Sequence, residues 1–217
     1  MILGIYCAGN LGRELVDLAR RINNITKRWE DIVFVDEQRL EREYYDVKVC
    51  KLEDLSNQRE NVEFVIANGT PVNREKIFNR VRENKYRMGD LIDPTAIISN
   101  SAVLKKNSGI IITAYSSISS NVCIKENVLI QPYVRVPHDV NIGAHCVLSS
   151  NASLGGRISI GKNTFIGLGA SLRENIVIGD DVIIGMGANV VSDISPRTIN
   201  IGNPSKMVGK NITGQIF

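Results

Sequence analysis

The chain of 217 residues has few of the side chains from which metal sites and disulfide frameworks are built. It contains two histidines, and its four cysteines, Cys7, Cys50, Cys123 and Cys146, lie far apart without a C-x-x-C pair. Zinc knuckles and disulfide frameworks need closely or regularly spaced cysteines. The sequence therefore indicates neither, and we expect four reduced thiols and no metal.

A long apolar run and a strong charge are also missing. No apolar stretch approaches the roughly eighteen residues of a membrane span. The formal net charge is only +3, and the basic residues form no run. The first residues, MILGIYCAGNLG, enter a glycine loop without a basic region or a small-residue cleavage site. We expect a soluble, cytoplasmic protein whose partners include neither nucleic acid nor a membrane.

Residues 1–90 alternate short apolar strands with helical patterns. Strands are predicted at 1–7, 31–37 and 62–69, and helices at 12–22, 51–60 and 72–84. This alternation is typical of a small parallel α/β sheet. Its ligands are expected at the carboxyl ends of the strands, where the first glycine loop meets a helix N-terminus.

After residue 90 a period of six replaces the helical pattern. Every sixth residue from Ile112 to Val190 is Ile, Leu or Val, at fourteen successive positions. An earlier phase, Ile92, Ile98 and Leu104, joins this series after a two-residue slip near SGIIIT. A period of six is typical of a β-solenoid with three short sides and coils of eighteen residues. We expect the periodic residue to point inward and a small residue four positions later to fill the corner.

The motif [Leu/Ile/Val]-Gly-x-x-small-x, as in IGKNTF and IGDDVI, resembles the hexapeptide-repeat acyltransferases. The stretches CAGNLGRELVDLA, VFVDE, VIANGTPVNREKI, LIDPTAIISNSA, PHDVNIG and IGNPSK narrow the resemblance. They are similar to sugar acetyltransferases of the sialic acid O-acetyltransferase and UDP-aminosugar N-acetyltransferase group. This resemblance implies a Rossmann-like nucleotide-sugar-binding domain over 1–90 and a left-handed parallel β-helix acetyltransferase domain over 91–217. It also implies acetyl-CoA as co-substrate and a homotrimer with active sites between neighbouring solenoids.

The resemblance assigns His138 as the general base and Asp139 as its partner. Imidazole accepts a proton near neutral pH, as attack of an amine or hydroxyl on a thioester requires. Eighteen residues later comes Gly156, so a three-sided coil places its backbone N–H beside the base, where it could bind an oxyanion. The alternatives are an exposed histidine without a role and a glycine needed only for its turn.

The remaining site residues follow from the same resemblance. Leu168 stacks over Met186 beside two pairs of glycines, a slot suited to the pantetheine arm, and Lys206 could meet a CoA phosphate. The nucleotide-sugar contacts that the resemblance implies lie at the ends of the first three strands: Gly9, Asn10, Gly12, Asp36, Glu37, Asn68 and Gly69. The alternative is a nucleotide fold that has lost or changed its ligand.

The sequence departs from the family pattern at several positions. Pro137 replaces an asparagine before the base, Val147 replaces a second histidine, and Cys7 begins a loop that keeps only part of the glycine motif. His145 does not fill the missing place, and we expect it at the surface. Three functions stay open: N-acetylation of a UDP-linked aminosugar, O-acetylation of sialic acid or another free sugar, and a non-catalytic scaffold. A zinc hydrase is excluded, because two histidines cannot supply its usual ligand set.

Overall fold

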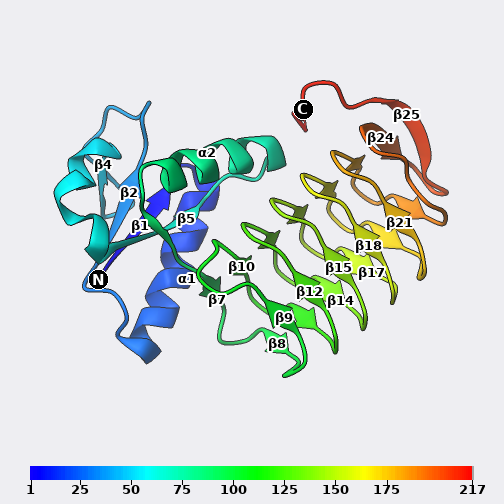
Figure 1. The fold of residues 1–217 in the computed structure, drawn as a ribbon, viewed down its shortest axis with the longest axis horizontal. Helices are drawn as coiled ribbons and strands as arrows, with labels where there is room; N and C mark the ends of the chain where they lie inside the picture. Colours follow the sequence, from blue (N-terminus) through cyan, green and yellow to red (C-terminus); the bar gives the residue numbers. More distant parts are fainter. Residues whose placement is uncertain (217) are drawn as a thin grey trace.

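The computed structural model describes residues 1–216 and shows a twisted α/β sheet beside a triangular solenoid (Figure 1). Strands up to Met88 belong to the sheet, and strands from Leu91 onward belong to the solenoid. The predicted fold class, a Rossmann-like parallel α/β domain followed by a left-handed parallel β-helix, is confirmed.

The N-terminal sheet has the strand order β3-β4-β2-β1-β5-β6, and all its neighbours are parallel except β3 and β4. Its elements are β1 (Ile2–Tyr6), α1 (Asn10–Thr26), β2 (Asp31–Val35), β3 (Glu43–Tyr44), β4 (Val47–Cys50), η1 (Glu53–Asn61), β5 (Val62–Ile66), α2 (Pro71–Glu83) and β6 (Arg87–Met88). The three predicted strands and the first and third predicted helices are present, with ends shifted by a few residues.

One local prediction was wrong, and one element was missed. The segment predicted as a helix at 51–60 is the 3-10 helix η1, whose backbone is non-helical at Gln58. The hairpin of β3 and β4 was not predicted at all. Its two turn residues, Tyr45 and Asp46, both have positive φ angles of 57° and 54°. Hairpin turns of this kind usually carry Asn-Gly or Asp-Gly, so this sequence gives no turn signal.

The solenoid consists of three parallel sheets, which we call the first, second and third face. The first face contains β7 (Leu91–Ile92), β10 (Ile111–Ile112), β13 (Leu129–Ile130), β16 (Val147–Leu148), β19 (Phe165–Ile166), β22 (Ile183–Ile184), β24 (Thr198–Ile201) and the antiparallel β25 (Lys206–Lys210). The second contains β8 (Ile97–Ile98), β11 (Ser117–Ile118), β14 (Arg135–Val136), β17 (Ser153–Leu154), β20 (Ser171–Leu172) and β23 (Asn189–Val190). The third contains β9 (Val103–Leu104), β12 (Cys123–Ile124), β15 (Asn141–Ile142), β18 (Ser159–Ile160) and β21 (Val177–Ile178).

The coil length and the inward positions agree with the sequence prediction. Ile112 pairs with Ile130, eighteen residues later, whereas its partner in the preceding coil is Ile92, twenty residues earlier. The two-residue slip is therefore confirmed. Each periodic residue from Ile112 to Val190 is at most 4% exposed, and the small corner residues Ala152, Thr164, Ala170 and Ala188 are buried. The solenoid core is thus a stack of aliphatic side chains that neighbouring coils bury for one another.

Short turns between the strands join the faces at three corners. The first corner joins the first and second faces at 113–116, 131–134, 149–152, 167–170 and 185–188. The second corner joins the second and third faces at 119–122, 137–140, 155–158 and 173–176. The third corner completes each coil at 125–128, 143–146, 161–164 and 179–182. In every one of these turns the third residue has a positive φ, between 54° and 64°.

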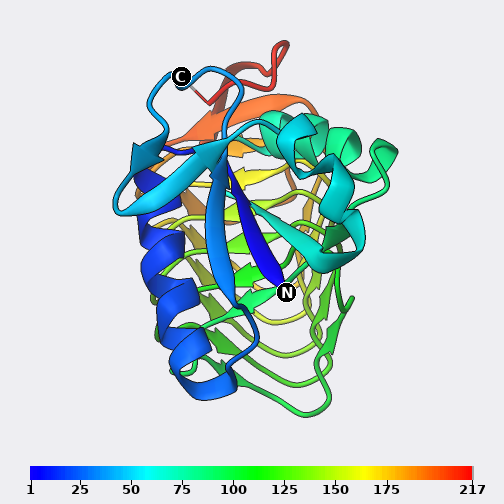
Figure 2. The same ribbon diagram turned by 90° about the vertical axis from the view of Figure 1, so that its left-hand side faces the viewer.

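The N-terminal domain covers the first face and the third corner. Helix α1 lies along the first coils (Figure 2), where Leu91, Ile111 and Leu129 share one buried cluster with Leu15 and Leu18. Helix α2 contacts the third corner through the ring of Phe78, which packs on a turn of the solenoid. The second face lies opposite the third corner and takes no part in these contacts.

An ion pair between a half-exposed arginine and a buried aspartate helps to hold α1 on the first solenoid turn. Arg21 Nη2 donates to Asp93 Oδ2 at 2.6 Å, and the Asp93 side chain is buried. Burial alone raises the pKa of Asp93, but the hydrogen bonds from Thr95 and Arg21 outweigh it and hold that pKa below its usual 3.8. The ionised form therefore stabilises the folded state above the unfolded pKa, and this contribution disappears as the pH falls through the lower folded pKa.

We expect Asp93→Asn to lower the free energy of unfolding at pH 7 by about 1–2 kcal/mol, because it removes a charge-assisted hydrogen bond to a half-exposed arginine. The difference from wild type should shrink below about pH 4, where wild-type Asp93 also loses its charge. Urea unfolding at several pH values measures this. A difference that stays constant down to about pH 2 would contradict it.

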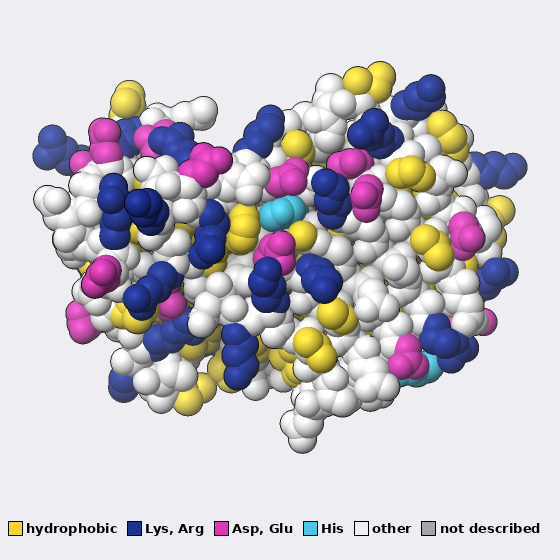
Figure 3. Space-filling view, viewed as in Figure 1, with side chains coloured by type: hydrophobic (Ala, Val, Ile, Leu, Met, Phe, Trp, Pro, Cys, Tyr) yellow, Lys and Arg dark blue, Asp and Glu magenta, His cyan; other side chains and the backbone are white. Residues whose placement is uncertain are grey.

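Basic and acidic side chains are interspersed over the face in Figure 3, without a patch of one sign. Among residues 1–216, no helix is long and apolar enough to cross a membrane.

Candidate active site

His138 and Asp139 lie together on the second corner, in the turn after β14. Asp139 has a φ of 60°, and its Oδ2 lies 2.8 Å from His138 Nδ1. A carboxylate only accepts hydrogen bonds, so Nδ1 carries a proton, and in the neutral imidazole Nε2 is then the nitrogen with the lone pair. The hydrogen bond from His138, followed by one from Asn121 at 3.3 Å, lowers the pKa of Asp139. The pair is thus an imidazole with a free basic nitrogen and an ionised partner.

Gly156 lies directly against the His138 ring, as stacking by eighteen residues predicts. A Cβ atom at Gly156 would come within 2.8 Å of His138 Cε1 and 2.9 Å of Nε2. Within residues 1–216 the Gly156 N–H donates no hydrogen bond. The absence of a side chain at Gly156 therefore lets the imidazole lie against its backbone, and the N–H of this residue has no partner among the described residues.

We expect Gly156→Ala to fold normally but to lower kcat by about tenfold or more, since the new methyl group displaces the imidazole. The side chain of His138 is half exposed and can swing outward, so the folded state loses little stability. Steady-state kinetics and a thermal melt, compared with wild type, test both parts. Unchanged kcat would show that the close contact does not matter.

The first corner borders a long groove of ≈ 990 Å³ between the solenoid and the N-terminal domain. Leu168 and Met186 form part of its wall and are 51% and 67% exposed. Its floor is apolar and includes Val147, Phe165 and Ile183 from successive coils of the first face. The structure thus brings Leu168 and Met186 together at a groove long enough for an extended ligand.

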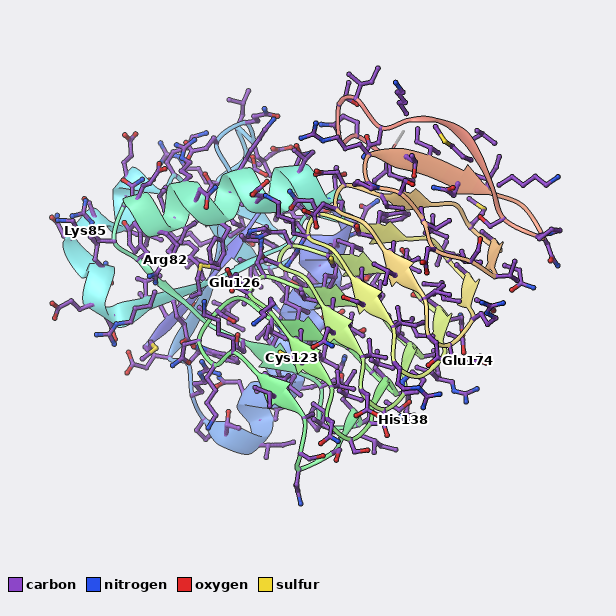
Figure 4. The ribbon with its side chains drawn as sticks, turned by 45° about the vertical axis from the view of Figure 1, so that its right-hand side comes forward. Arg82, Lys85, Cys123, Glu126, His138 and Glu174 are labelled. Carbon is purple, nitrogen blue, oxygen red and sulfur yellow. The ribbon has the colours of Figure 1, made fainter. Side chains whose placement is uncertain are left out.

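Within one chain the base and the groove are apart. His138 is on the second corner, whereas the groove follows the first corner, and the second face separates them. Figure 4 shows His138 and Glu174 along one edge of the solenoid, away from Arg82 and Lys85 near α2. Lys206 lies exposed on β25, outside the lining of the groove. A single chain therefore cannot bring all the predicted acetyl-transfer residues to one place.

The predicted nucleotide contacts divide into three groups. Gly9, Asp36 and Asn68 line a hollow of ≈ 580 Å³ at the carboxyl ends of β1, β2 and β5, and Glu37 joins Asp36 and Asn68 in an adjoining hollow of ≈ 480 Å³. Gly69 lies on the groove of the first corner. These residues thus lie at the carboxyl ends of the strands, where a Rossmann-like sheet is expected to bind its ligand.

The other two predicted contacts, Asn10 and Gly12, interact with neighbouring residues of their own domain. Asn10 Oδ1 accepts a hydrogen bond from Arg13 at 2.8 Å. A Cβ atom at Gly12 would lie 2.6 Å from the Cys7 carbonyl oxygen and 2.8 Å from the Phe34 ring, so this glycine permits close packing of α1. Neither residue lines the two hollows.

The carboxylate of Asp36, at the end of β2, already accepts hydrogen bonds from the protein backbone. It accepts backbone hydrogen bonds from Ala8, Gln38 and Arg39 at 2.9, 2.9 and 3.1 Å. Burial alone would raise its pKa, but these bonds outweigh that effect and hold the pKa below the usual value. The carboxylate therefore shapes the loops of the hollow in addition to any contact with a ligand.

The expectation that His145 lies at the surface was wrong. His145 is 7% exposed and packs edge-on against Phe78 of α2, with ring centroids 5.2 Å apart. Its Nδ1 lies 3.0 Å from Asn127 Nδ2, and burial lowers its pKa. The reason is the docking of α2 on the third corner, which no solenoid period reveals.

Arg74 was missed by the sequence analysis. Its side chain is fully buried and donates to the carbonyl oxygens of Ile66, Asn68 and Asn127 at 2.6, 3.1 and 2.9 Å. It also donates to Asn127 Oδ1 at 2.8 Å. This guanidinium therefore joins the end of β5 to the third corner. An arginine on an amphipathic helix gives no sign that it will be buried.

Among residues 1–216, no group of three or more His, Cys, Asp and Glu side chains is placed to hold a metal ion.

Comparison with known proteins places both parts of the chain. Residues 3–81 match the family model described as PglD N-terminal domain, and residues 124–156 match bacterial transferase hexapeptide (six repeats). The chain is similar to the acetyltransferase domain of PglB from Neisseria gonorrhoeae in complex with acetyl coenzyme A, with 27% identity and a TM-score of 0.87 over 95% of this chain and 98% of that one. It is also similar to PerB from Caulobacter crescentus in complex with CoA and GDP-perosamine, with 27% identity and a TM-score of 0.84 over 96% and 98% of the two chains. The chain is therefore similar over nearly its whole length to sugar acetyltransferases, the group that its motifs resemble.

Proposed function

We propose that the protein transfers an acetyl group from acetyl-CoA to the amino group of a nucleotide-linked aminosugar, in the cytoplasm and as a homotrimer. The observation that carries this proposal is the His138–Asp139 pair, whose imidazole ring lies against Gly156 where no side chain intervenes. The similar PglB and PerB structures hold acetyl coenzyme A, and CoA with GDP-perosamine, respectively.

In this mechanism Nε2 of His138 removes a proton from the amine as its nitrogen attacks the thioester carbonyl carbon. Asp139 stabilises the imidazolium that forms. The N–H of Gly156 donates to the carbonyl oxygen as it gains negative charge. The C–S bond then breaks, and the imidazolium returns its proton to the departing thiolate. The groove beside Leu168 and Met186 receives the pantetheine arm.

A trimer brings the separated base and groove together. If the three copies are related by rotation about an axis parallel to the solenoid axis, equivalent coils keep the same position along that axis. The first corner of one copy can then meet the second corner of the next. Pro132 and His138 hold the same turn position on these corners, six residues apart. Their heights therefore differ by a third of the strand spacing, about 1.6 Å. His138 of a second copy thus stands level with Pro132, which lines the groove.

The N-terminal domain supports a nucleotide-linked acceptor over a free sugar. Its hollows at the strand ends adjoin Gly69, which also lines the groove. A nucleotide bound at the strand ends could thus extend its sugar into the groove. Lys206 remains a candidate contact for a CoA phosphate, and Asn10 for the nucleotide.

The test compares acetyl-CoA turnover with UDP-linked 4-aminosugars, GDP-linked 4-aminosugars and free sialic acid. We expect turnover with a nucleotide-linked amine and none with sialic acid. Turnover with sialic acid alone would establish the O-acetyltransferase alternative. Failure of the native protein to bind acetyl-CoA in calorimetry would favour a non-catalytic scaffold.

A further inference from the structure

Two exposed tyrosines occupy the left-handed turn position of the first corner. Tyr115 and Tyr133 have φ angles of 58° and 63°, whereas the same turn position holds Asn151, Gly169 and Gly187 in later coils. Bulky residues enter this left-handed region at a cost. Since all the corner turns given above use this left-handed position, the conformation belongs to the fold, and these two coils differ from the later ones in the large aromatic side chain that they place there.

The two rings form one exposed aromatic surface. Their centroids are 5.2 Å apart with an interplanar angle of 18°, and the residues are 59% and 54% exposed. Tyr133 follows directly after Gln131 and Pro132, where the lining of the groove ends. Stacked aromatic rings that stay half exposed are typical of surfaces that another molecule covers.

A polar pair lies on the second corner, displaced from the tyrosines by about 1.6 Å along the solenoid axis. Asn121 and Asp139 hold the turn position of Tyr115 and Tyr133, each six residues further along the chain. Asn121 Nδ2 donates to Asp139 Oδ1 at 3.3 Å. If the first corner of one copy meets the second corner of its neighbour, the two tyrosine rings of the first copy therefore face Asn121 and Asp139 of the neighbour.

We propose that Tyr115 and Tyr133 of one copy pack across Asn121 and Asp139 of the next, and so position the catalytic His138 of that second copy. This inference rests on the proposed trimer and on His138 as the base. Tyr133 covers the outer side of the carboxylate, restricts the access of water to it and keeps it aimed at Nδ1. Tyr115 supports the Tyr133 ring. Both are positioning residues, because they act through Asp139.

Disulfide cross-linking tests the contact without altering the base. We expect Tyr115→Cys combined with Asn121→Cys to give disulfide-linked dimers and trimers after mild oxidation. Tyr115→Cys combined with Asn175→Cys is the matched control, because Asn175 holds the same turn position three coils away and should not cross-link. Wild type and the single variants measure any reaction of the native cysteines. A trimer that does not cross-link through 115 and 121 would overturn the inference.

Kinetics of Tyr133→Asn test the positioning role. Asparagine is the residue that this column has at Asn151, so the turn should form and the variant should fold. We expect kcat to fall about 10- to 100-fold with an unchanged KM for acetyl-CoA, and Tyr133→Phe to restore it. Wild-type kcat in a trimeric Tyr133→Asn variant would refute the role. Absence of acetyl transfer by wild type would instead refute the proposed function.

Discussion

His138→Ala lowers kcat for acetyl transfer by about 10²- to 10⁴-fold, the usual contribution of a general base. The loss falls on kcat because the imidazole accepts its proton only as the amine attacks. The groove on the first corner remains intact, so the affinity for acetyl-CoA should not change. Stopped-flow or steady-state transfer assays measure the rate, and calorimetry measures binding.

The control for this prediction is Ser192→Ala. Ser192 follows β23 on the same edge of the solenoid, fifty-four residues after His138, and is exposed. Asp139→Asn provides a second probe, because its amide group can donate to Nδ1 and leave the proton on Nε2. That change should lower kcat while the fold persists. A His138→Ala enzyme with normal kcat would exclude His138 as the base.

Arg74→Ala is expected to reduce the free energy of unfolding by about 3–5 kcal/mol. The change removes every donor that serves the carbonyl groups of Ile66, Asn68 and Asn127, and it leaves a cavity between α2 and the third corner. Burial lowers the pKa of Arg74, but several carbonyl acceptors stabilise its charge. Urea unfolding monitored by circular dichroism measures the loss.

Arg82→Ala on the exposed side of α2 serves as the matched control and should change stability by less than about 0.5 kcal/mol. The loss of unfolding free energy for Arg74→Lys should lie between those of the two alanine variants, since an ammonium group reaches fewer carbonyl oxygens. If Arg74→Ala cost no more than Arg82→Ala, the buried hydrogen bonds would contribute nothing net to stability.

The periodic parts of this protein were predictable because their signals are local. Inward residues such as Ile112 and Val136 recur every six positions, and each coil repeats the environment of the previous one. Stacking by eighteen residues placed Gly156 against His138 for the same reason. The strands β1, β2 and β5 and the helices α1 and α2 of the N-terminal domain were also predictable from their own hydrophobic patterns. The β3–β4 hairpin did not, because its turn lacks the usual residues.

By itself the sequence determined the coil length, the slip of two residues, the residues that fill the solenoid and the family that the motifs resemble. The tertiary structure decided how the two domains meet. That contact buries His145 and Arg74, creates the groove on the first corner and leaves the second face open. The physical reason is that burial at a domain interface depends on the shapes of both surfaces, whereas the period of a repeat reports only the inside of one of them.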